Sequence, residues 1–136
     1  MHPLLKPFRG PLTTNPFEPA LRAIPAIAYM ALIYLASSVP GDEITISFDD
    51  RVAHFLEYFI FGVLLVFAAS AYQRGTLPRA AGAILAFAAL HAIADEFHQS
   101  FVPNRDSSVK DFVFDMLGTS AALFLLWRFV KTKEAR

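Results

Sequence analysis

Ionisable side chains recur at one-turn spacing inside an apolar part of this 136-residue chain. Asp50, His54, Glu57 and Tyr58 follow one another at intervals of four, three and one, so a single helix face would carry all four. Carboxyl and imidazole groups on one face can transfer protons, bind hydroxyls or amines, or pair as metal ligands. In a membrane-spanning helix such groups each cost roughly 2.5–3.5 kcal/mol on insertion scales, so they usually serve a purpose.

Two further polar sets occur later in the chain, again with main spacings of three or four residues. The second set is His91, Asp95, Glu96, His98 and Gln99, and the third is Asp111 and Asp115. His91, Asp95 and His98 would share one helix face, with Glu96 and Gln99 flanking it, and Asp111 and Asp115 would share another face with Gly118.

Long apolar blocks carry these sets. Apolar residues make up 55% of the chain and charged residues only 18%, which is too little polar surface for a soluble domain of this size. Each block approaches the ~20 residues that cross the hydrocarbon of a bilayer, and none shows the strict alternation of a strand. We therefore predict an all-α polytopic membrane protein, a four-transmembrane-helix bundle, with helices at about 23–39, 52–72, 80–98 and 110–130.

The ends of the chain differ from the blocks. Five prolines precede residue 20, and no apolar signal-peptide core is present, so residues 1–20 are predicted to form an irregular N-terminal arm. Residues 21–130 form the predicted membrane domain, and residues 131–136 a basic C-terminal tail.

Basic residues predict the orientation. Nine of the twelve Lys and Arg residues lie in the N-terminal arm and first helix edge, the second connection or the C-terminal region. The positive-inside rule then puts both termini in the cytoplasm. The start of the second helix, the end of the third and the start of the fourth would meet at the outer face, where the three polar sets could converge.

The third connection adds a cation to this outer face. Pro103-Asn104 is typical of a turn, because proline fixes φ and asparagine tolerates the left-handed region. The turn would present Arg105 beside the carboxylates, and Ser107 or Ser108 could cap the fourth helix.

Several classes of function are disfavoured. A net charge of zero gives no case for nucleic-acid binding, and the absence of cysteine excludes disulfides and thiolate chemistry. The pairs His54/Glu57 and Asp95/His98 have ligand-like spacing, but no ligand set is specific, so we predict no metal and no cofactor.

The same residues resemble the VanZ-like family of small bacterial integral membrane proteins. The family pattern is matched by Asp50-Arg51-Val52-Ala53-His54 with Tyr58, by residues 95–105 (Asp95-Glu96 through Gln99, Phe101 and Pro103 to Arg105) with Asp111, and by Gly118. The likeness covers roughly residues 33–125. Arg51 stands for the usual Lys, Asn104 for Gly, and Asp115 where Asn is common. The resemblance implies a multi-pass protein of the bacterial cytoplasmic membrane, and for one member a link to teicoplanin resistance.

Three functions follow as hypotheses. The first is an outward-facing pocket that engages a lipid head group or cell-envelope precursor; the second is a membrane-embedded acid–base or metal-assisted enzyme on a lipid-linked substrate; the third is a structural or accessory subunit. The predicted pocket residues are Asp50, Arg51, His54, Glu57, Tyr58, His91, Asp95, Glu96, His98, Gln99, Arg105, Asp111 and Asp115. The deep carboxyls of Glu57 and Asp115 are expected to pair with His54, with His91 or with each other. Enzymatic activity and oligomeric state stay open.

Overall fold

The structure, a computed structural model, describes residues 17–44, 49–70 and 77–134, without the side chains of 77–79 and 130–134. The described residues form four α-helices and one 3-10 turn: α1 Glu18–Ser37, η1 Gly41–Glu43, α2 Asp50–Ala69, α3 Leu77–Gln99 and α4 Val109–Glu134. All four helices are long and apolar enough to cross a membrane. The predicted all-α bundle of four candidate membrane helices is therefore confirmed.

The helix bounds differ from the predicted ones at both ends of the chain. Helix α1 begins at Glu18 because Pro19 lies in its first turn, where a missing amide hydrogen breaks no helical bond. Helix α4 continues to Glu134 and so includes most of the predicted tail. The rest of the predicted N-terminal arm, residues 1–16, lies outside the described residues.

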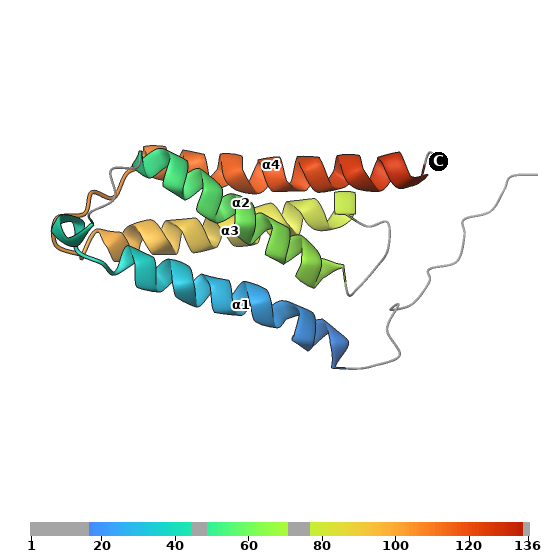
Figure 1. Cartoon of the computed structure of the whole chain (residues 1–136), viewed down its shortest axis with the longest axis horizontal. Helices are drawn as coiled ribbons and strands as arrows, with labels where there is room; N and C mark the ends of the chain where they lie inside the picture. The colour runs from blue at the N-terminus through green and yellow to red at the C-terminus, as the bar shows by residue number, and fades with distance from the viewer. Residues whose placement is uncertain (1–16, 45–48, 71–76, 135–136) are drawn as a thin grey trace, which may run out of the picture.

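The helices form a bundle in which α2 and α4 make the most extensive contact (Figure 1). Helix α1 packs mainly on α2, and α3 on α4 and α2, so α1 and α4 lie on opposite sides. The 3-10 turn η1 and the connection 100–108 lie at one end, hereafter the loop end. The start of α1 and the end of α4 lie at the opposite end.

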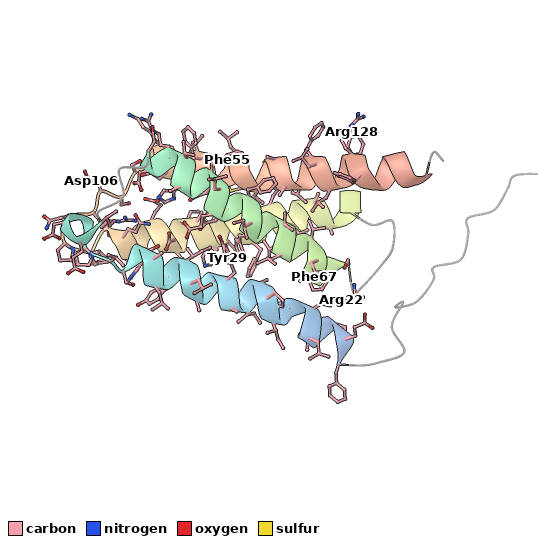
Figure 2. The ribbon with its side chains drawn as sticks, viewed as in Figure 1. Arg22, Tyr29, Phe55, Phe67, Asp106 and Arg128 are labelled. Atoms are coloured by element: carbon pink, nitrogen blue, oxygen red, sulfur yellow. The ribbon has the colours of Figure 1, made fainter. Side chains whose placement is uncertain are left out.

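Polar and apolar side chains are distributed as a lipid environment requires. Buried positions include His54, Asp95, Gln99 and Asp115, whereas Leu90 is 68% exposed. Other large apolar side chains are also exposed, among them Ile27, Leu35, Phe97, Phe124 and Phe129. Figure 2 shows side chains pointing outward along the bundle. A soluble monomer rarely exposes this much apolar surface, and here the helix lengths suit a bilayer.

Glycines allow α2 and α4 to approach closely. A Cβ atom added at Gly118 would lie 2.8 Å from the backbone nitrogen of Phe59 and closer still to the Phe55 carbonyl oxygen. A Cβ at Gly62 would lie 3.0 Å from the Ala122 Cβ. Small residues give this close approach where lipid supplies no hydrophobic drive between helices. The contact fixes the register of α2 against α4 and therefore the partners of their polar residues.

A second set of contacts ties α1 to α2 at the opposite end (Figure 2). The Arg22 guanidinium donates to Ser70 Oγ at 2.9 Å, pairs with Glu18, and lies 5.5 Å from the centre of the Phe67 ring. Arg128 also lies toward this end, and Asp106 lies at the loop end. The cytoplasmic placement of the basic end stays a prediction.

Candidate functional site

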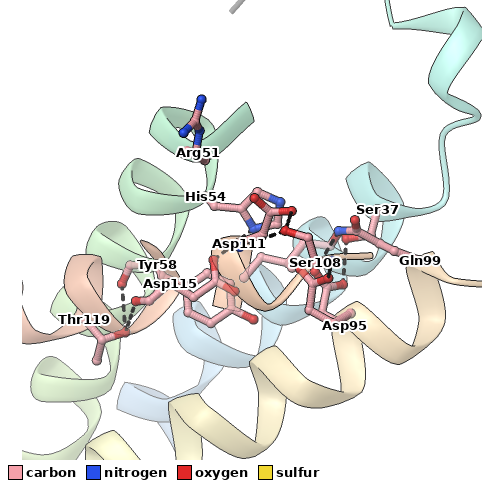
Figure 3. A network of polar contacts seen from close by, with 12 residues as sticks. Ser37, Arg51, His54, Tyr58, Asp95, Gln99, Ser108, Asp111, Asp115 and Thr119 are labelled. Atoms are coloured by element: carbon pink, nitrogen blue, oxygen red, sulfur yellow. Dashed lines mark hydrogen bonds and ion pairs between the residues drawn. The ribbon is translucent and has the colours of Figure 1, made fainter. Parts of the chain in front are cut away.

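A buried imidazole–carboxylate pair joins α2 to α4 near the loop end (Figure 3). His54 Nδ1 donates to Asp115 Oδ1 at 2.9 Å, and the two side chains are 3% and 0% exposed. The crossing at Gly118, three residues beyond Asp115, sets this distance. Asp115 therefore pairs with His54, one of the partners predicted for it. The other carboxylate oxygen of Asp115, Oδ2, is buried and has no hydrogen-bond partner.

Hydrogen bonds extend from this pair toward the centre of the bundle. Thr119 Oγ1 donates to the Asp115 carbonyl at 3.1 Å and lies 3.4 Å from the Tyr58 carbonyl. The Tyr58 hydroxyl is hydrogen-bonded to His91 Nδ1 at 2.9 Å and so links α2 to α3. Phe61 packs against the His91 ring with centroids 5.0 Å apart. Beyond these contacts the described buried side chains are apolar, among them Phe61, Ala88 and Ala122.

The end of α3 is bound to the end of α1. Ser37 Oγ lies 2.6 Å from Asp95 Oδ1, and Gln99 Nε2 donates to Asp95 Oδ2 at 3.2 Å, so both oxygens of this buried carboxyl are engaged. His98 Nε2 is hydrogen-bonded to Ser38 Oγ at 2.9 Å. These contacts hold the ends of α1 and α3 together.

The start of α4 is capped by Ser108, which decides between the two predicted serines. Its hydroxyl donates to Asp111 Oδ2 at 2.7 Å and accepts from the Asp111 amide at 3.3 Å. Its own amide donates to Glu96 Oε2 at 2.8 Å, so α3 and α4 share this residue. Glu96 Oε1 is buried and has no hydrogen-bond partner.

The loop end is closed by backbone contacts. The Gly41 amide donates to the Pro103 carbonyl at 3.1 Å, which ties η1 to the connection between α3 and α4. Asn104 adopts a φ of 58°, the left-handed conformation expected for the predicted turn. A Cβ at Gly41 would lie 2.7 Å from the Asn104 carbonyl carbon, so only glycine fits there.

Four predicted site residues are less engaged. Asp50 is exposed, and Arg51 pairs with Asp49 at 3.2 Å, pointing away from the buried cluster (Figure 3). Glu57 is half-buried and forms no hydrogen bond with another described side chain. Arg105 is half-buried in the 100–108 connection and forms no salt bridge with a described carboxylate.

Sequence reasoning did not include the α1 residues Ser37 and Ser38, or Thr119 of α4, in the site. The two serines at the end of the first apolar block could have indicated this contact, because the first and third membrane helices must end at the same membrane face. An uncharged hydroxyl carries little insertion cost, so it did not stand out.

Among the described residues, two groups of side chains have ligand atoms within 4.8 Å of one another, near enough to hold a metal ion after small rotations. One contains His54, Glu96 and Asp115, and the other His54, Asp50 and Asp111. Both contain His54 but neither contains Glu57, Asp95 or His98, so neither ligand pair suggested by spacing occurs in these groups. The cluster can therefore bind a cation, hold a proton between His54 and Asp115, or bind the polar groups of a ligand.

Comparison with known proteins places the chain in one family. Searches of curated proteins and of solved structures each gave no match. The VanZ/LLP1 family model matches residues 23–131, which include the four candidate spans except the first residues of α1. Most positions that carried the resemblance are buried, at the loop end or just below it: His54, Tyr58, Asp95, Glu96, Gln99, Asp111 and Gly118. The chain therefore belongs to the VanZ/LLP1 family of membrane proteins.

Proposed function

We propose that the loop end binds the anionic head group of a membrane lipid or of a lipid-linked cell-envelope precursor. The observation that carries the proposal is Arg105, a half-buried cation that forms no salt bridge with a described carboxylate and lies in the connection between the polar ends of α3 and α4. A guanidinium offers paired donors that match a phosphate or carboxylate. Lys110, the second residue of α4, is exposed and adds a second positive charge.

The position of this cation supports the proposal. Arg105 lies in the connection between two candidate spans, where the hydrocarbon ends and lipid head groups begin. The Gly41–Pro103 hydrogen bond and the Asn104 turn fix the backbone around it, so less conformational entropy is lost on binding.

The sidedness of the site is part of the proposal. Nine of the twelve basic residues lie in the arm and first helix edge, the second connection or the C-terminal region. By the positive-inside rule these parts would face the cytoplasm, and the loop end would face away from it. A cell-wall precursor is displayed on that face, and changed display of such precursors would account for the glycopeptide resistance linked to one VanZ-like protein.

Lipid co-purification tests the proposal. The wild type, Arg105→Ala and Arg128→Ala are purified in a mild detergent, and bound lipids are extracted and identified by mass spectrometry. Arg128→Ala is the matched control, because it removes the same charge from the opposite end. We expect a phosphate-bearing lipid enriched with the wild type and the control, and depleted with Arg105→Ala. Identical lipid profiles for all three proteins would refute head-group binding through Arg105.

The His54–Asp115 pair favours a second candidate, an acid–base enzyme on a lipid-linked substrate. A buried carboxylate that holds an imidazole at 2.9 Å orients it for proton transfer. In this case His54→Gln would bind the same lipid as the wild type but leave its mass unchanged during incubation in vesicles. If neither protein converts the lipid, the binding function stands without the enzyme.

The same contacts also fit a structural subunit, and stability distinguishes this alternative. A purely structural role predicts that Arg105→Ala lowers the melting temperature and leaves the lipid profile unchanged. Head-group binding predicts the reverse, since Arg105 forms no salt bridge with a described carboxylate.

A further inference from the structure

Two buried carboxylates at the loop end each use one oxygen and leave the other without a partner. Glu96 Oε2 accepts from the Ser108 amide at 2.8 Å, and Asp115 Oδ1 accepts from His54 Nδ1 at 2.9 Å. Glu96 Oε1 and Asp115 Oδ2 have no partner, although the residues are only 8% and 0% exposed. An unsatisfied carboxylate oxygen in a low-dielectric interior is costly, so both oxygens indicate a missing positive group.

The two carboxylates face a common point. One oxygen of each carboxylate and one ring nitrogen of His54 lie within 4.8 Å of one another. Ligand atoms around a tetrahedral ion with 2.1 Å bonds are about 3.4 Å apart, so a small rotation of these side chains would close the set. Glu96 is already held at its second oxygen by the Ser108 amide, as the ligands of a bound ion generally are, and the ion would replace the proton that His54 Nδ1 now donates to Asp115.

We propose that His54, Glu96 and Asp115 form a binding site for a divalent transition-metal cation. One imidazole and two carboxylates suit Zn²⁺ and Mn²⁺, since imidazole favours the former and carboxylate the latter. Two carboxylates neutralise the charge of the ion, which matters in a site flanked by lipid.

The structure also provides a route for the ion. Asp50 and Asp111 form the second group around the same His54, with ligand atoms again within 4.8 Å. Asp111 is buried, whereas Asp50 is exposed at the start of α2. A cation would therefore pass from solvent along carboxylate oxygens to the deeper set.

The three proposed ligands could not be recognised from residue spacing within one helix, because they come from three different helices. His54 lies on α2, Glu96 on α3 and Asp115 on α4, so each helix contributes one ligand. One-turn pairs on a single helix, such as His54 with Glu57, do not provide the set.

Binding of the metal alone tests the site. Tag-free protein in detergent is stripped with chelator and titrated with Mn²⁺, whose free form is followed by its electron paramagnetic resonance signal; Zn²⁺ is then added as competitor. We expect one Mn²⁺ per chain, displaced by Zn²⁺. Glu96→Gln and Asp115→Asn should each weaken binding at least about tenfold.

Two control variants show whether these residues are the ligands. Glu57→Gln removes a half-buried carboxylate from α2 that belongs to neither group, and should leave affinity within about twofold of the wild type. Asp50→Asn should retain binding, because Asp50 lies only on the route. Loss of binding in Asp50→Asn with retention in Glu96→Gln would overturn the proposed set in favour of the outer group.

A folding control keeps the test decisive. The wild type should melt at a higher temperature with saturating Mn²⁺ than without it, and Glu96→Gln should show no such rise. Without metal, Glu96→Gln should melt no lower than the wild type, because the substitution removes a charged oxygen that has no partner. Absence of Mn²⁺ and Zn²⁺ binding by folded wild-type protein would refute the site.

The cation site does not depend on the head-group proposal. The titration contains no added lipid, and Arg105→Ala should bind Mn²⁺ like the wild type. Failure of one proposal therefore leaves the other unaffected.

Discussion

The α2–α4 crossing allows a graded test of the packing that positions the site. A Cβ at Gly118 would lie 2.8 Å from the Phe59 nitrogen, whereas ordinary contact begins near 3.4 Å. The Gly118→Ala substitution must therefore part the two backbones by at least about 0.6 Å. The two nearest neighbours, the Phe59 nitrogen and the Phe55 carbonyl oxygen, are backbone atoms within helix α2, so neither can move aside as a flexible side chain could.

The loss of stability follows from this displacement. Overpacking of a tight contact costs about 1–3 kcal/mol. The added separation would also lengthen the 2.9 Å His54–Asp115 bond to the limit of hydrogen bonding, which costs about 1 kcal/mol more. We expect Gly118→Ala to lower the free energy of unfolding by about 2–4 kcal/mol and to weaken Mn²⁺ binding.

Two other glycines complete the series. Gly62→Ala would place its Cβ 3.0 Å from the Ala122 Cβ, so its loss should be smaller. A Cβ added at Gly82, an exposed position of α3, would have no neighbour within 4 Å. Gly82→Ala should therefore leave the free energy of unfolding unchanged or raise it by up to about 1 kcal/mol.

Reversible unfolding in mixed micelles measures the series, with helicity followed by circular dichroism and α4 by the fluorescence of Trp127, the only tryptophan. If Gly118→Ala proves as stable as Gly82→Ala, the close α2–α4 crossing and the register built on it are wrong.

Three further substitutions test separate contacts. Ser37→Ala removes the 2.6 Å hydrogen bond to buried Asp95 and should cost about 1.5–3 kcal/mol in the same unfolding assay, whereas equal stability would contradict the α1–α3 link. Tyr58→Phe removes the hydrogen bond to His91 and should cost about 1 kcal/mol while Mn²⁺ affinity is kept; a loss of affinity would place this pair within the metal site. Gly41→Ala displaces the facing connection and should lower lipid recovery as Arg105→Ala does, and an unchanged profile would separate the head-group site from that connection.

The bundle itself could be predicted because its physical cause is local. Four apolar blocks of nearly bilayer length leave helices as the structure that satisfies the backbone in lipid. The gathering of polar residues at one end also followed from chain direction alone, since alternating spans bring the start of α2, the end of α3 and the start of α4 together. Asp95, Glu96, Gln99 and Asp111 are buried there as this argument requires.

Partner choice could not be predicted in the same way. Helical spacing assigned His54 and Glu57 to one face, but it does not fix which residue of another helix lies at the same depth. That depth depends on the α2–α4 crossing at Gly118, a contact between backbones with no polar signal. Asp115 therefore meets His54, while Glu57 stays half-buried without a described hydrogen-bond partner.

The start of α1 shows a different limit. Prolines in the first 20 residues predicted an irregular arm, because proline breaks helix interiors. Pro19 instead lies in the first turn, and Pro25 lies inside α1 without ending it. In a membrane helix the freed carbonyl can be satisfied by neighbouring groups, so proline is a weaker stop signal than in water.

The balance of satisfied and unsatisfied groups argues that the cluster does more than hold the helices together. Asp95 has both oxygens engaged, and Asp111 is joined to the Ser108 cap. A role in stability accounts for these contacts. It does not account for Glu96 and Asp115, where glutamine or asparagine would keep an acceptor for the contact already made without burying a charge. Residues that oppose stability in this way are typical of functional sites, so the two unpartnered oxygens, rather than the whole cluster, are where binding is to be sought.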